Sequence, residues 1–70
     1  MKIVEVKDID ILRALAQTPG QGVKTTEIKN RISQHANQIE VTNLLLKLVK
    51  QKLVVRVAPA TYQLAPGVKV

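Results

Sequence analysis

Three polar side chains with the chemistry to contact nucleic acid recur at helical spacing in the middle of the chain. Asn43, Lys47 and Lys50 occupy positions i, i+4 and i+7, which places them along one line of a helix. An asparagine amide can form two hydrogen bonds with adenine, and a lysine ammonium can reach phosphate or guanine. The spacing therefore predicts a stripe that faces DNA, while an ordinary solvated helix face would carry the same residue types.

The excess of positive charge lies on the same part of the chain. The 70 residues carry 11 Lys and Arg against 5 Asp and Glu, a net charge of +6. Residues 1–23 hold three of each sign, so residues 24–70 carry the entire excess. This asymmetry indicates a polyanionic partner. Tyr62 is the only aromatic residue, so base stacking of the kind used on single strands and RNA is not expected, and duplex DNA is favoured.

Neighbouring segments supply further candidates for DNA contact. Thr25 and Thr26 open a second helix, whose free N–H groups could bind phosphate or be capped by the threonine hydroxyls. Arg56 lies within a predicted hairpin and could reach the DNA backbone. Around the second helix, further phosphate contacts are expected from Lys24, Lys29 and Arg31. The full set of expected DNA-binding residues is Thr25, Thr26, Lys29, Gln38, Thr42, Asn43, Lys47, Lys50 and Arg56.

The sequence shows no arrangement of residues that is typical of a catalytic site or a metal site. There is no cysteine, and His35, the only histidine, lies in a polar stretch typical of a turn. Residues 19–22 lack the Lys-Ser/Thr pair of a phosphate-binding loop. We expect no enzymatic activity, no cofactor, no metal and no small-molecule effector. No apolar run approaches the roughly 20 residues that cross a bilayer, and residues 1–6 are too short and charged for an export signal, so a cytoplasmic, nucleoid-associated location is expected.

Apolar periodicity predicts the elements that position these side chains. Three helices are predicted, over residues 9–17, from Thr25 or Thr26 onward, and over residues 38–52. A short strand is predicted at Val23, and two further strands over residues 53–57 and 61–64. Asp8 and Asn37 are the expected N-caps of the first and third helices. The side chains expected to face the core are Ile11, Leu12, Leu15, Ile28, Ile32, Val41, Leu44, Leu45 and Leu48.

The third helix carries more apolar side chains than one core needs. Ile39, Leu46 and Val49 widen its apolar arc beyond the core stripe. An exposed patch of this kind marks an interaction site, so these residues are the expected interface of a homodimer. The amino-terminal segment, or a different protein, could cover them instead.

The order of helices and strands resembles the winged helix-turn-helix domains of MarR-type and ArsR-type transcriptional regulators. The resemblance rests on residues 11–16, 25–28 and 44–56, and the glycine that precedes the strand in those domains is Lys52 here. It implies an α+β fold of three helices with a C-terminal two- to three-stranded β-hairpin wing, and a recognition helix over about residues 38–52. The resemblance covers about residues 8–65, the expected winged-helix domain. The flanking residues themselves predict an arm or edge strand over residues 1–7 and a flexible tail over residues 66–70.

Two functions follow as expectations. The first is a duplex DNA-binding protein, acting as a transcriptional regulator or a small architectural factor. The second is a winged-helix module for protein–protein interaction, a subunit of a larger assembly, in which the extra apolar side chains of the third helix would contact a different protein. The two differ in salt dependence, because phosphate contacts weaken steeply as salt is added and apolar contacts do not.

Overall fold

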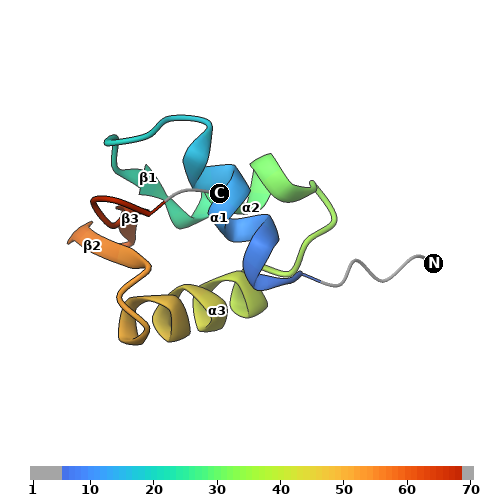
Figure 1. The fold of residues 1–70 in the computed structure, drawn as a ribbon. Coiled ribbons are helices and arrows are strands. Elements are labelled where there is room, and N and C mark those ends of the chain that lie inside the picture. Colours follow the sequence, from blue (N-terminus) through green and yellow to red (C-terminus); the bar gives the residue numbers. More distant parts are fainter. Residues whose placement is uncertain (1–5, 69–70) are drawn as a thin grey trace.

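The computed structural model describes residues 6–68, which form three helices and a three-stranded antiparallel sheet (Figure 1). The elements in chain order are α1 (Asp8–Ala16), β1 (Val23–Lys24), α2 (Thr25–Ile32), α3 (Gln38–Lys50), β2 (Val54–Ala58) and β3 (Thr61–Leu64). The prediction of an α+β fold with three helices is confirmed. The third helix ends two residues earlier than predicted, at Lys50. Residues 1–5 of the predicted arm and residues 69–70 of the predicted tail lie outside the described residues.

The first two helices begin differently from the prediction. Lys7 rather than Asp8 is the N-cap of α1, and the Asp10 carboxylate accepts a hydrogen bond from the Lys7 backbone N–H at 3.0 Å. Neither threonine caps α2, because its N-cap is Lys24 and no side chain makes a cap hydrogen bond there. The Thr25 N–H donates instead to the carbonyl of Ala60, at 3.0 Å. The cap of α1 is thus a local bond one residue earlier than predicted, whereas at α2 a distant carbonyl accepts the N–H of the first helical residue.

Both ends of α3 are fixed by local hydrogen bonds. Asn37 is its N-cap, as predicted, and the Asn37 side chain accepts from the N–H groups of Ile39 and Glu40 at 2.8 and 3.3 Å. At the other end, the Lys52 N–H donates to the Val49 carbonyl and the next N–H donates to the Leu48 carbonyl, both at 3.0 Å. This pair of bonds is a Schellman motif, and Lys52 takes the left-handed conformation it requires, with φ of 64°. The motif turns the chain from the helix into β2.

β3 is the central strand of the sheet, between β1 and β2. Val23 pairs with Tyr62 on one side, and Val54 pairs with Leu64 on the other. The predicted hairpin is confirmed, with a bulge near the turn between Arg56 and Ala58. β2 is therefore an edge strand. The hairpin that it forms with β3 lies at one end of the molecule (Figure 1).

The core lies between the three helices and the inner face of the sheet. The largest fully buried side chains are Ile11, Leu15, Ile28, Leu45, Leu48, Val41 and Val54. The other residues predicted to face inward, Leu12, Ile32 and Leu44, are partly buried and pack against this core. Val6 is also buried, and its N–H donates to the Glu40 carboxylate at 3.1 Å, so the chain just before α1 is held against α3. None of the helices within residues 6–68 has the length and apolar character that crossing a membrane requires.

Candidate nucleic-acid interface

One line of side chains on α3 points away from the core. Val41, Leu45 and Leu48 bury one side of the helix, and Ile39, Asn43, Leu46 and Lys50 are exposed on the opposite side. The spacing i, i+4, i+7 and i+11 places these four within an arc of about 60°. We call them the outer ridge. In Figure 1 this helix runs along one side of the molecule, so its outer surface faces away from the other helices.

The outer ridge combines residues of the predicted DNA stripe with residues of the predicted dimer interface. Asn43 and Lys50 belong to the predicted DNA stripe, while Ile39 and Leu46 belong to the predicted dimer interface. In the structure they alternate along a single exposed line, where Ile39 is 73% exposed and Leu46 is 49% exposed. Val49, the third predicted dimer residue, is half-buried and packs against the chain's own core, so we correct its assignment to the core. A partner bound to the apolar members of the ridge would also cover its polar members.

The remaining candidates on α3 lie beside the ridge. The Lys47 ammonium donates to the Asp8 carboxylate at 3.2 Å, so this cation is paired with the first residue of α1. The Thr42 hydroxyl donates to the Gln38 carbonyl at 2.9 Å, and Thr42 is half-buried. Gln38 is exposed in the first turn of the helix. Of the predicted stripe of three residues, Asn43 and Lys50 lie on the ridge, and neither side chain has a hydrogen-bond or ion-pair partner within residues 6–68.

The residues predicted around α2 are mostly engaged within the chain. Thr25 is buried and its N–H donates to the Ala60 carbonyl in the hairpin turn, so this N–H is already bonded within the chain and is not offered to a phosphate. Thr26 is exposed in the first turn of α2. The Lys29 ammonium donates to the Gln34 carbonyl at 2.6 Å, across the turn that follows the helix. Thr26 is thus the threonine of this pair that a phosphate could reach.

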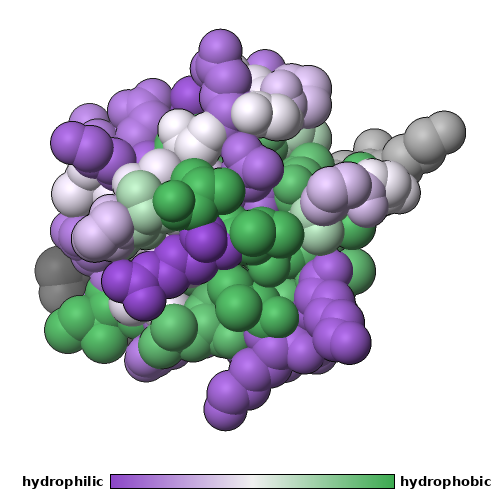
Figure 2. All heavy atoms as spheres, turned by 90° about the vertical axis from the view of Figure 1, so that its left-hand side faces the viewer, coloured by the Kyte–Doolittle hydropathy of each residue, from purple (hydrophilic) through white to green (hydrophobic). Residues whose placement is uncertain are grey.

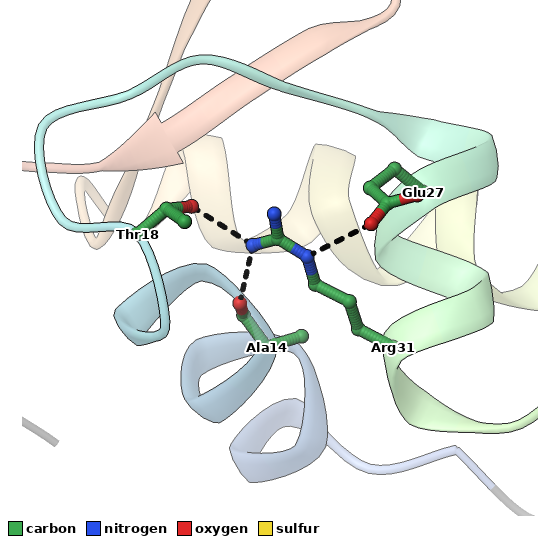
Figure 3. Close-up of polar contacts among 4 residues, drawn as sticks. All are labelled: Ala14, Thr18, Glu27 and Arg31. Carbon is green, nitrogen blue, oxygen red and sulfur yellow. Dashed lines mark hydrogen bonds and ion pairs between the residues drawn. The ribbon is translucent and has the colours of Figure 1, made fainter.

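Arg31 joins α1 to α2 and is not a surface cation (Figure 3). One terminal nitrogen donates to the Ala14 carbonyl at 3.0 Å and to the Thr18 hydroxyl at 2.8 Å, and Nε pairs with Glu27 at 3.3 Å. Its side chain is only 18% exposed. The Ala14 carbonyl is one of the last four in α1, which have no partner within the helix, so the guanidinium satisfies it. The expectation of a phosphate contact from Arg31 is therefore replaced by a structural role, which the i, i+4 spacing from Glu27 could have indicated.

The exposed part of β2 carries two valines and one arginine. Figure 2 faces the end that carries the sheet and shows hydrophobic side chains gathered there beside strongly hydrophilic ones. Val55 and Val57 are exposed on β2, and Arg56 between them is exposed as predicted. Lys52 is exposed in the turn that precedes this strand. Arg56 and Lys52 therefore lie on the segment that follows the C-terminal end of α3, where Lys50 ends the outer ridge.

Each acidic side chain within residues 6–68 is engaged by a neighbouring group. Asp8 pairs with Lys47, and the Asp10 carboxylate accepts from a backbone N–H at the start of α1. Glu27 pairs with an arginine on its own helix, and Glu40 accepts from the N–H of Val6. Glu40 thus contacts the segment before α1 and is not a member of the outer ridge. No acid of the described part of the chain lies on the ridge or on the hairpin, so the cations there are not neutralised by close acids.

Comparison with protein families, with characterised proteins and with solved structures finds no match to this chain. What the chain binds is therefore inferred from its own residues. The features that bear on the question are the outer ridge, the unpaired cations at its C-terminal end, and the exposed arginine of the hairpin.

Proposed function

We propose that this chain is a winged-helix domain that binds duplex DNA, with α3 as the recognition helix and the β2–β3 hairpin as the wing. The order of three helices and a final hairpin agrees with that arrangement. The observation that carries the proposal is the outer ridge, because it presents Asn43 and Lys50 on a helix surface with no acid. The role would be that of a transcriptional regulator or a small architectural factor.

The dimensions of α3 suit the major groove. Its 13 residues span about 20 Å, and the groove is about 12 Å wide and admits one helix. With the ridge facing the base edges, the Asn43 amide could pair with adenine and the Lys50 ammonium could reach phosphate or guanine. Arg56 would then contact the backbone beside the groove, and Thr26 at the start of α2 could donate to a phosphate.

Charge supports a large sequence-independent component of binding. The net charge of +6 lies wholly on residues 24–70, the part of the chain that contains α2, α3 and the hairpin. If about four to six phosphates are contacted, the slope of log K against log salt concentration should be about −4 to −5. A contact that depends mainly on apolar burial should have a slope near zero.

The test is a titration of random-sequence duplex DNA, followed by fluorescence anisotropy at several salt concentrations. Lys50→Gln should weaken binding and reduce the magnitude of the salt slope by about 1. Arg13→Gln is the matched control, because it also removes one positive charge from an exposed position, but on α1. Undetectable binding of any duplex at low ionic strength would refute the proposal. Equal losses in the two variants would show that net charge, and not the outer ridge, determines affinity.

A second candidate function is protein–protein interaction, including formation of a homodimer. The observation in its favour is the exposure of Ile39 and Leu46, two large apolar side chains on one helix surface. A symmetric pair joined through these residues would bury Asn43 and Lys50 with them, so this dimer and DNA binding through the ridge exclude each other. Sedimentation equilibrium of the parent and of Leu46→Glu distinguishes the two. A parent that is dimeric, and a variant that is monomeric, would favour this function; a monomeric parent at micromolar concentration would rule out the dimer.

A further inference from the structure

The outer ridge has a pattern that phosphate binding alone does not require. Ile39 and Leu46 are large apolar side chains on the exposed side of α3, and they alternate with Asn43 and Lys50. A helix that contacts only the DNA backbone needs cations and hydrogen-bond donors, and gains nothing from isoleucine or leucine in the groove. These two apolar side chains would gain from a partner surface that is itself apolar.

The major groove offers one such group. Among the base edges exposed there, thymine alone carries a C5-methyl group, and the other positions are hydrogen-bond donors or acceptors. Adenine, its pairing partner, presents the N6 and N7 pair that an asparagine amide can bind with two hydrogen bonds. The apolar side chains of the ridge therefore suit thymine, and the asparagine amide suits adenine, which are the two bases of an A·T pair.

The spacing along α3 fits neighbouring base pairs. Ile39 precedes Asn43 by four residues and Leu46 follows it by three, which are rises of about 6 and 4.5 Å along the helix. Base pairs follow one another at about 3.4 Å, so each apolar side chain falls one to two steps from the pair that the asparagine would read. The three side chains together cover a site of about four base pairs.

We propose that the outer ridge selects duplex DNA in which thymine methyl groups lie beside an adenine, with Ile39 and Leu46 as specificity-determining residues. This inference rests on the proposed function. Lys50 and Arg56 supply affinity for any duplex, and Asn43 reads adenine. The apolar side chains add a preference for A·T pairs, because burying them against thymine methyl groups removes apolar surface of both partners from water.

The test compares two duplexes that differ only in the methyl group. Both have one mixed, A·T-rich sequence, and the second contains deoxyuridine in place of every thymidine. The parent should bind the thymine duplex more tightly, by about fourfold for each methyl group that is buried. Ile39→Ser and Leu46→Ser should each reduce this ratio. The matched control is Ile9→Ser, which removes an exposed isoleucine of α1 and should leave the ratio unchanged.

Three results would overturn the inference, and they separate it from the proposed function. If the two duplexes bind equally and binding still depends on salt, the preference for thymine methyl groups is refuted, while the proposed DNA binding stands. A ratio that falls equally in Ile9→Ser and Ile39→Ser would show that the preference does not arise on the outer ridge. Absence of binding to both duplexes at low salt would refute the proposed function as well.

Discussion

Replacing Lys52 with glycine should stabilise the protein. Lys52 has φ of 64° at the C-terminal end of α3, where both Schellman hydrogen bonds depend on the left-handed conformation. That conformation costs an L-residue with a side chain about 1–2 kcal/mol, and glycine adopts it without this cost. Glycine has a more flexible unfolded state, which offsets about 0.5–1 kcal/mol of the gain. The expected increase in the free energy of unfolding is about 0.5–1 kcal/mol, and an increase of 1 kcal/mol raises the melting temperature of a domain this small by about 4–8 °C.

The control for this variant is Lys52→Ala. Both substitutions remove the same positive charge near the helix C-terminus, but alanine keeps the Cβ atom that makes the left-handed conformation costly. Thermal and urea unfolding, followed by circular dichroism at fixed pH and salt, should place the glycine variant about 1 kcal/mol above the alanine variant, with an unchanged dependence on urea concentration. If the two variants are equally stable, Lys52 does not hold this conformation in solution and the Schellman motif is wrong.

Four further substitutions test the core and its supports through the free energy of unfolding. Leu45→Ala should lower it by about 2–5 kcal/mol, while Leu46→Ala on the outer ridge should change it by less than about 1 kcal/mol; similar losses would contradict the assignment of the two sides of α3. Arg31→Met should lower it by about 1–3 kcal/mol, because the Ala14 carbonyl loses its donor, and a neutral result would remove Arg31 from the helix junction. Gly22→Ala should lower it by about 1–3 kcal/mol, because the added Cβ would lie 2.7 and 2.8 Å from methyl groups on the sheet; an unchanged stability would mean that those side chains rotate away freely.

Local sequence patterns were sufficient to predict most of the fold. The Asn37 cap, the buried stripe of α3 and the hairpin each depend on residues within a few positions of one another. The caps of α1 and α2 could not be predicted in this way. Asp8 is paired with Lys47, 39 residues further along the chain, and the Thr25 N–H is bonded to the carbonyl of Ala60 in the hairpin turn. At α2 a tertiary contact takes the N–H that a local cap would satisfy, whereas at α1 the cap is a local bond between Lys7 and Asp10, and Asp8 is engaged elsewhere.

The sequence predicted the exposure of single candidate residues, but not how these residues are grouped on the surface. Asn43, Lys50 and Arg56 are exposed as expected, because their polarity and helical or strand position suffice to predict it. The burial of Arg31 depends on Ala14 and Thr18, which the sequence does not place beside it. A cation on a helix is ordinarily expected to be solvated, and only the assembled junction between α1 and α2 shows otherwise.

The two sides of α3 differ in what they contribute to folding. Val41, Leu45 and Leu48 contribute burial to the core and have no exposed surface for a partner. Ile39 and Leu46 contribute little to the core, so their apolar character is not accounted for by stability. An apolar side chain that folding does not need adds a risk of non-specific association, which polar residues at the same positions would avoid. Ile39 and Leu46 lie on the same exposed side of α3 as Asn43 and Lys50, so substitutions there should leave the free energy of unfolding nearly unchanged and, under the proposed function, should change which duplex the protein prefers.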